Sequence, residues 1–220
     1  MFLKLIAFIL PWPLRRRAMQ SWFGYSIHPA AKIGLSWVYP GKLIMYEGAR
    51  IGHLNIAIHL DEMQLGAKSS IARGNWITGF PSNTASKHFG HQQGRRSVFI
   101  LGEHAAITKH HHFDCTNVIE IGRFTTIAGY QSQFLTHSID VIEGRQDSAK
   151  ISIGEYAFVG TNVVMLGGAG LPARSVLGAK SLLNKSYTEE WMLYGGVPAK
   201  PIQPIPTDAK YFTRDIGFVY

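Results

Sequence analysis

The sequence predicts an all-β fold, a solenoid of parallel strands built from six-residue repeats. Three features indicate it: a bulky apolar residue recurs at every sixth position, glycine often follows it, and a small residue often stands four positions after it. A period of six fits neither an α-helix, with about 3.6 residues per turn, nor an ordinary strand, with a period of about two. The longest unbroken run is Ile153, Val159, Met165, Leu171, Leu177 and Leu183.

Earlier runs of the same pattern extend the solenoid over residues 27–185. They are Ile27, Ile33, Tyr39, Met45 and Ile51, then Leu65, Ile71 and Ile77, then Leu101, Ile107 and Phe113, and finally Ile121 and Ile127. One coil of such a solenoid cannot bury its own apolar side chains. Coils therefore stack, and each coil satisfies the backbone hydrogen bonds of the next. We expect the repeated apolar residues to lie along the axis of the solenoid.

The repeat loses its register at residues 81–98 and 134–152, and such breaks in a solenoid mark loops. The first loop is polar and carries His88 and His91, and the second contains His137. After Leu183 the repeat stops. Residues 186–220 are predicted to form a short helix over 186–193 and then a proline-rich tail, because proline continues neither a helix nor a central strand.

Residues 1–26 form a segment of a different kind. Its first ten residues are apolar, a Pro-Trp-Pro break follows, and Arg15, Arg16 and Arg17 come next. Ten residues are too few to cross a bilayer, which takes about 20 residues in a helix. The charge follows the apolar stretch, whereas a signal peptide has its charge first. Two interpretations stay open: a helix at a membrane interface, or a helix that packs on the body or on a neighbouring subunit.

Charge and cysteine content narrow the functional classes. The net charge of +8 favours anionic partners or ligands. No nucleic-acid-binding motif accompanies it, so we expect no nucleic acid partner. The single cysteine, Cys115, excludes an internal disulfide. It fits a reducing compartment, and we expect a cytoplasmic protein.

Five short motifs in the last coils are specific enough to suggest a family. They are Ile153-Gly154-Glu155, Phe158-Val159-Gly160, Leu177-Gly178-Ala179, Asn184-Lys185 and Gly196-Val197-Pro198-Ala199-Lys200. With them, residues 151–202 resemble the C-terminal part of the hexapeptide-repeat acyltransferases. That family usually has asparagine where Val197 stands. Residues 111–147 are most similar to acyltransferases of exopolysaccharide gene clusters, which favours a glycan acceptor.

The resemblance implies a left-handed β-helix and a homotrimer with active sites between neighbouring subunits. It further implies an O-acetyltransferase that uses acetyl-CoA as co-substrate and modifies a sugar hydroxyl of a polysaccharide or glycolipid precursor. The apolar N-terminus would allow peripheral contact with the inner face of the plasma membrane. Two alternatives stay open, which are N-acylation of an amino sugar nucleotide and a β-helix that serves only as an assembly module.

Acyl transfer to a hydroxyl needs a base for the hydroxyl proton, and histidine suits this role because its usual pKa is about 6.5. The resemblance assigns the role to His137. Asp114, Asp140 and Glu143 are candidates for the carboxylate that orients this base, and the sequence does not choose among them. His111 stands where the repeat usually has a small residue. It is a candidate for contact with the acceptor or the thioester, or else an ordinary packed histidine.

The family pattern also suggests the residues that hold the co-substrate. It places four residues beside CoA: Thr161, Ala179, Asn184 and Lys185. It places Lys200 near the CoA phosphates, and Lys180, which follows Ala179, is a further candidate. The oxyanion of the tetrahedral intermediate needs a donor, expected from a backbone amide near Gly160 or Gly168. The histidines lack the spacing of the zinc-binding β-helix enzymes, and we expect no metal.

Overall fold

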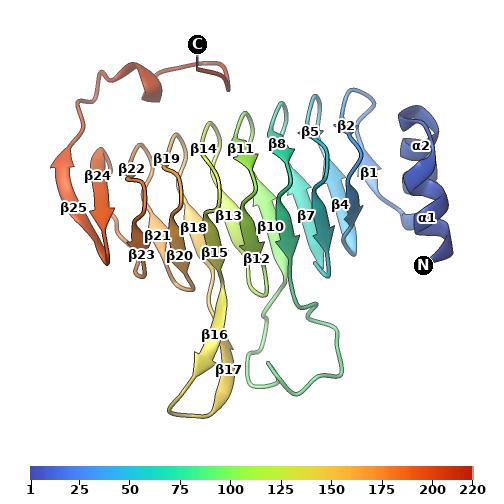
Figure 1. The fold of residues 1–220 in the computed structure, drawn as a ribbon, viewed down its shortest axis with the longest axis horizontal. Coiled ribbons are helices and arrows are strands. Elements are labelled where there is room, and N and C mark those ends of the chain that lie inside the picture. The colour runs from blue at the N-terminus through green and yellow to red at the C-terminus, as the bar shows by residue number, and fades with distance from the viewer. Residues whose placement is uncertain (220) are drawn as a thin grey trace.

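The computed structural model describes residues 1–219, in which three sheets of short parallel strands form the three faces of a β-helix (Figure 1). Successive strands along the chain belong to successive faces, so each coil contributes one strand to each sheet. The prediction of an all-β, left-handed parallel β-helix over most of the chain is confirmed.

The strands are short, as a six-residue repeat requires. The first face contains β1 (Ser26–Ile27), β4 (Lys42–Met45), β7 (Glu62–Leu65), β10 (Val98–Leu101), β13 (Ile119–Ile121), β18 (Ile151–Ile153) and β21 (Gly170–Leu171). The second contains β2 (Lys32–Ile33), β5 (Arg50–Ile51), β8 (Ser70–Arg73), β11 (Ala106–Lys109), β14 (Thr126–Ile127), β19 (Phe158–Val159), β22 (Val176–Leu177), β24 (Met192–Gly196) and β25 (Ala199–Pro204). The third contains β3 (Trp37–Tyr39), β6 (Ile56–Ile58), β9 (Trp76–Thr78), β12 (His112–Asp114), β15 (Gln133–Leu135), β20 (Val164–Leu166) and β23 (Leu182–Leu183).

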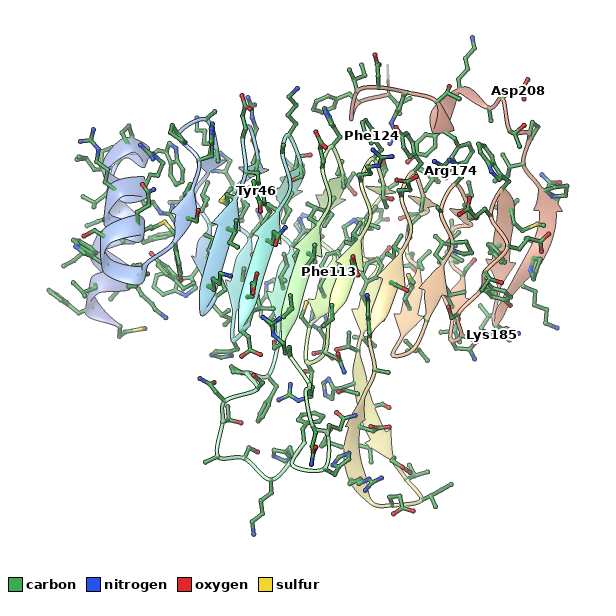
Figure 2. All side chains as sticks on the ribbon, turned by 180° about the vertical axis from the view of Figure 1, so that it is seen from behind. Tyr46, Phe113, Phe124, Arg174, Lys185 and Asp208 are labelled. Carbon is green, nitrogen blue, oxygen red and sulfur yellow. The ribbon has the colours of Figure 1, made fainter. Side chains whose placement is uncertain are left out.

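The repeated apolar residues are buried, none of them more than 3% exposed. They stack coil on coil, as Phe113 on Phe134 shows, with ring centroids 4.5 Å apart inside the solenoid; Figure 2 labels Phe113 there. Tyr39 differs from the prediction. The strand register pairs Val38, not Tyr39, with Ala57 of the next coil, so Val38 occupies the axial column. The Tyr39 side chain lies outside the axial column, where it is buried and its hydroxyl donates to the Lys4 carbonyl at 2.7 Å.

Two helices, α1 (Phe2–Ile9) and α2 (Trp12–Phe23), cover the first coil. Arg15 of α2 is buried and donates to the carbonyl oxygens of Gly34 (3.0 Å) and Ser36 (2.6 Å). Gly24 ends α2 with a φ of 68°, in the left-handed region that glycine adopts readily. A solenoid needs such a cap because its first coil would otherwise expose its apolar interior. Within residues 1–219, no helix is long and apolar enough to cross a membrane.

The C-terminal end corrects one prediction. Residues 186–193 do not form a helix; instead β24 and β25 form an antiparallel hairpin. β24 pairs with β22, placing Tyr194 opposite Leu177, and the tyrosine is fully buried in the axial column. Pro201 and Pro204 lie on β25, the edge strand, where a missing backbone N–H is tolerated. The tail, with the 3-10 helix Lys210–Phe212, runs back along the solenoid (Figure 1).

Candidate active site

Both insertions leave the solenoid on the same side (Figure 1). The first lies between β9 and β10. The second follows β15 and contains the hairpin of β16 (His137–Asp140) and β17 (Arg145–Ser148). Gln92 joins them, since its side-chain amide donates to Asp147 Oδ1 (2.6 Å) and to the Ser148 carbonyl oxygen (2.8 Å). The two predicted loops therefore form one structure beside the end of β12, which lies between β9 and β15 in the third sheet.

His137 and Asp114 form a hydrogen-bonded pair at this place. Asp114 is the last residue of β12, and parallel pairing sets it opposite Leu135 of β15. The chain then turns outward, and Nδ1 of His137 bonds to Oδ2 of Asp114. Asp140 is occupied elsewhere, because its Oδ1 accepts from the backbone N–H groups of Ile142 and Glu143 in the hairpin turn. Of the three carboxylates that the sequence left open, the structure sets Asp114 beside the ring.

The surroundings keep the Asp114 carboxylate ionised. It is 7% exposed, and its Oδ1 accepts from the backbone N–H (3.1 Å) and the hydroxyl (2.7 Å) of Thr116. Burial alone would raise the pKa of Asp114, but the hydrogen bonds from His137 and Thr116 outweigh burial and lower it. A carboxylate with a filled set of donors is a fixed acceptor for the neighbouring imidazole.

The hydrogen bond to Asp114 raises the pKa of His137 above its ordinary 6.5, against the opposing effects of partial burial and of the Arg95 charge. The side chain is 41% exposed. Since Asp114 accepts at Nδ1, the neutral ring carries its proton there and leaves Nε2 as a free base. The ring of Phe89, from the first insertion, packs edge-on against His137 at 6.2 Å.

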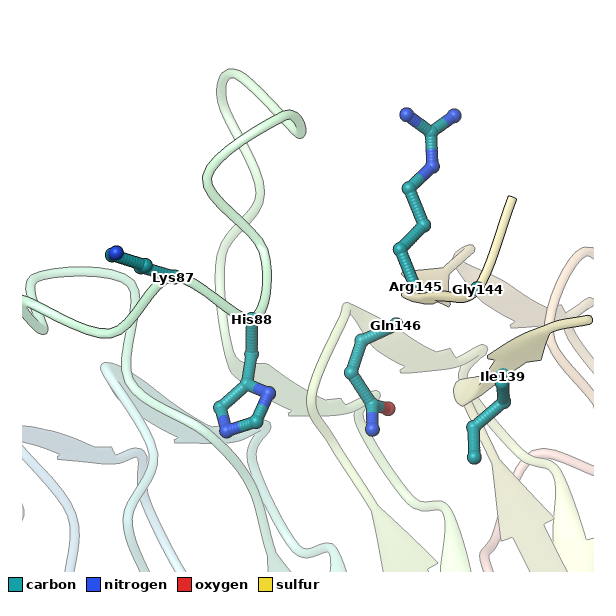
Figure 3. A pocket seen from close by; sticks show the side chains of 6 residues that line it. All are labelled: Lys87, His88, Ile139, Gly144, Arg145 and Gln146. Atoms are coloured by element: carbon teal, nitrogen blue, oxygen red, sulfur yellow. The ribbon is translucent and has the colours of Figure 1, made fainter.

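His137 lines a cavity of about 340 Å³. Ser148 of the hairpin, Gly167 of the next coil and Asn184, which follows β23, line the same cavity. Asn184, a predicted CoA residue, therefore lines the same cavity as His137, the predicted base. A second cavity, of about 330 Å³, lies between the insertions and is lined by His88 and Gln146, among others; Figure 3 shows their side chains extending to the same side.

The structure does not bring His111 to this pair. His111 is 2% exposed, its Nδ1 accepts from the Ser132 backbone N–H (3.1 Å), and its Nε2 bonds to the Thr108 hydroxyl (2.9 Å). Burial lowers the pKa of His111 to about 4, and nearby His110 adds to the effect. Its position lies three residues before Asp114 along a strand, or about 10 Å away.

His111 belongs instead to a column of buried polar side chains at one corner of the β-helix. In this column each side chain accepts the backbone N–H of the residue one coil above: Asn55 donates to Ser36 Oγ (2.9 Å) and Asn75 donates to Asn55 Oδ1 (2.9 Å). His111 then donates to Asn75 Oδ1 (2.9 Å). The position that His111 occupies in the repeat thus requires a side chain that accepts the backbone N–H of the next coil. Serine and asparagine do so in the coils below, and the imidazole of His111 does so here.

The other predicted CoA residues lie in separate places along the last coils. Lys180 donates through its backbone to the Thr161 carbonyl (3.0 Å), and Ala179 adjoins them, all at the corner between the second and third faces. Lys185 lies at the opposite edge of the third face, beside Asn184 (Figure 2). Lys200 is on β25, paired with Gly195. A single chain therefore spreads these residues along the edges of one face and the terminal hairpin.

The backbone amides of Gly160 and Gly168 themselves are paired, so an oxyanion donor at either place would have to be a neighbouring amide. The Gly160 amide donates to the Leu177 carbonyl (2.8 Å) and the Gly168 amide to the Lys150 carbonyl (3.0 Å). Gly167, which lines the cavity, has no room for a side chain, since a Cβ there would meet the Thr136 carbonyl oxygen at 2.7 Å.

Sequence reasoning missed Thr116 and Gln92. The Asp-x-Thr spacing of Asp114 and Thr116 was the one usable signal, because such pairs form local side-chain turns. Among residues 1–219, no group of three or more His, Cys, Asp or Glu side chains is arranged to hold a metal ion.

Comparison with known proteins relates the chain to solved structures. No protein-family model matches the sequence, and no curated protein matches it. The polysialic acid O-acetyltransferase OatWY is similar, with a TM-score of 0.51 and 15% identity, over 85% of this chain and 90% of that one. A candidate acetyltransferase from Bacillus cereus, the BC4754 product, has a TM-score of 0.51 and 17% identity, over 84% and 80%.

A third structure extends over more of the chain. The hexapeptide-repeat-containing acetyltransferase VCA0836 of Vibrio cholerae covers 93% of this chain and 87% of its own, with 20% identity and a TM-score of 0.49. At these identities the likeness concerns the fold alone. The two structures with a TM-score of 0.51 are those of an acetyltransferase and a candidate acetyltransferase, so the chain has a fold that acetyltransferases adopt, as the motifs in its last coils suggested.

Proposed function

We propose that this protein is an acetyl-CoA-dependent O-acetyltransferase that acts on a sugar hydroxyl of a polysaccharide or glycolipid precursor. The observation that carries the proposal is the hydrogen-bonded pair of His137 and Asp114, beside a cavity that Asn184 also lines. The fold is one that hosts acetyltransferases, including an enzyme that acts on polysialic acid. A glycan acceptor is the substrate class that this relative suggests.

The chemistry follows from the geometry of the pair. As the acceptor hydroxyl attacks the thioester carbonyl, Nε2 of His137 takes the hydroxyl proton. Asp114 holds the ring tautomer and stabilises the imidazolium that forms. The tetrahedral intermediate then collapses, the carbon–sulfur bond breaks, and the imidazolium returns the proton to the departing CoA thiolate. The products are the acetyl ester and free CoA.

CoA binding is part of the same proposal. Asn184 would lie near the thioester, and Lys200 would lie near the phosphates, for which a mobile lysine charge is suited. The remaining contacts would come from Thr161, Ala179, Lys180 and Lys185. Since these residues are spread along edges of the solenoid, a groove completed by a neighbouring chain of a homotrimer would gather them. The proposed place of work is the cytoplasm, next to the inner face of the plasma membrane.

Replacing His137 with alanine tests the function. We expect turnover to fall roughly 100-fold or more, with CoA affinity unchanged in calorimetry, because the imidazole acts on the proton rather than on CoA. His28→Ala, an exposed histidine of the first coil, is the matched control and should keep full turnover. Unchanged turnover of His137→Ala would move the base elsewhere.

The alternatives give different outcomes in an acceptor panel. Preference for amino sugars over hydroxy sugars at saturation would favour N-acylation. Absence of both CoA binding and transfer to any acceptor would favour an assembly module.

A further inference from the structure

The outward face of α1 is apolar. Phe2, Leu5 and Ile9, spaced three and four residues apart, lie on one side of the helix and are 73%, 48% and 78% exposed. Ala7, on the opposite side, is fully buried. An apolar helix face is normally covered, yet here only the opposite side of α1 meets the protein. The folded chain therefore leaves an apolar stripe for another partner.

The neighbouring surface of α2 adds exposed apolar and basic groups. Leu14 is 51% exposed, and Arg17, three residues later on the same side of α2, is exposed as well. Arg15, by contrast, is buried and holds the first coil. The sequence has no acidic residue before Glu47, so no carboxylate of this segment offsets the basic charge. An exposed apolar helix face beside basic groups, with no carboxylate in the same segment, is typical of helices that lie at an anionic lipid surface.

We propose that this cap surface, formed by Phe2, Leu5, Ile9, Leu14 and Arg17, binds an anionic lipid bilayer. An eight-residue helix is about 12 Å long and cannot span a bilayer, so α1 lies in the plane of the interface with its apolar stripe among the acyl chains. Arg17 meets lipid phosphate, and its attraction is screened by salt.

The inference goes beyond acetyl transfer and does not depend on it. It also bears on how far the candidate active site lies from the membrane. β3, β6, β9 and β12 are consecutive strands of the third sheet, so Asp114 lies three coil spacings from the first coil, or roughly 14 Å at about 4.8 Å per coil. The cap helices lie between that coil and the bilayer and add about 10 Å, the diameter of one helix. An acceptor linked to lipid would have to reach across both.

The test is sedimentation of the full chain with vesicles of phosphatidylcholine, with and without phosphatidylglycerol. We expect the wild-type chain to bind the anionic vesicles, and binding to weaken as salt rises. Leu5→Gln/Ile9→Gln should lower the partition coefficient roughly tenfold or more. Arg17→Gln should lower it on anionic vesicles alone. Val141→Gln/Ile142→Gln is the matched control, since these residues are equally apolar and exposed at the hairpin tip.

The outcomes separate lipid from protein partners. Failure of the wild-type chain to bind anionic vesicles, or an equal loss in the hairpin control, would overturn the proposal. A change of oligomeric state in Leu5→Gln/Ile9→Gln without loss of vesicle binding would show that the surface joins copies of the chain. Circular dichroism melting verifies that each variant is folded. Deletion of the segment is a poor substitute, because it removes Arg15 and uncovers the first coil.

Discussion

At the scale of single residues, His137 and Asp114 each shift the pKa of the other. Asp114 is buried at the end of a strand, and without partners burial would raise its pKa; Thr116 and His137 supply the donors that lower it. The same hydrogen bond raises the pKa of His137. Each group is thus held in the state that proton transfer requires: a permanent carboxylate behind a histidine that titrates above its ordinary 6.5.

Asp114→Asn should move the pH profile of acetyl transfer. The base works when neutral, so the rate falls as pH drops through the raised pKa of His137. Without the carboxylate that pKa falls, and the acidic limb of kcat/KM should shift to lower pH. The maximal rate should fall roughly tenfold to a thousandfold, because the ring tautomer is no longer held.

A matched control for this shift is Asp140→Asn, which changes a carboxylate in the hairpin turn and should leave the profile in place. An acidic limb that stays fixed or moves upward in Asp114→Asn would contradict the assigned pairing.

His111 should prove structural. His111→Ala removes the acceptor for the buried Ser132 backbone N–H and should destabilise the protein by about 1–3 kcal/mol, seen as a lower urea midpoint. His111→Asn should recover most of that loss, because Asn55 and Asn75 fill the same position in the coils below. Turnover of the folded His111→Asn protein should stay near wild type. A large loss of turnover with normal stability would instead give His111 a part in the chemistry.

At the scale of elements, the two insertions enclose the site, and the coils supply Asp114 at the end of β12. The first insertion contributes Phe89 against His137, and Arg95 lies over the Phe89 ring at 4.5 Å while donating to the Thr116 carbonyl at 2.5 Å. The second contributes His137, the proposed base. Gln92 hydrogen-bonds across the two insertions, and Phe89 and His91 also contact the second one. The rigidity of the site therefore depends on side chains and not on sheet hydrogen bonds.

Gln92→Ala should loosen this tie. We expect faster amide exchange over residues 81–97 and a KM for the acceptor several-fold higher, with kcat little changed, because the dyad itself stays paired. Gln93→Ala, the exposed neighbour, is the control and should alter neither quantity. If Gln92→Ala lowered kcat and left exchange unchanged, Gln92 would act on the reaction and not on the loop.

At the scale of the whole molecule, the β-helix holds its functional segments at fixed positions along its axis. The helices α1 and α2 lie at one end, the hairpin that begins with the proposed base His137 lies near the middle, and the hairpin of β24 and β25 with Lys200 lies at the other end (Figure 1). Coils are packed too closely to slide, and glycines such as Gly52 and Gly122 lie against the backbone of the next coil. The edges of such a β-helix are where a second β-helix can pack, and the expected homotrimer follows this arrangement.

Light scattering after gel filtration checks the assembly. We expect a mass of three chains of 24.5 kDa each, since the proposed CoA residues are too dispersed in one chain to surround one ligand. A monomer that binds CoA with full affinity would contradict the shared groove, while leaving the pairing of His137 with Asp114 untouched.

The sequence by itself determined the solenoid and its two large interruptions, because a period of six can be satisfied only by stacked coils and a break in the period must leave the stack. The core extends one layer beyond the predicted boundary at residue 185, because Tyr194 joins the axial column. The family resemblance, and not the repeat, made His137 a candidate base. The repeat pattern placed Tyr39 in the axial column, which Val38 occupies instead. It also predicted a helix at 186–193, because a local pattern does not reveal that Tyr194 fills the last layer of the core.

Only the tertiary structure decided which carboxylate meets His137, that His111 belongs to a buried hydrogen-bonded column, and that Gln92 joins the insertions. These contacts join residues about one to three coils apart, and their formation depends on strand register. Register is set by the packing of the whole stack, which no single repeat encodes.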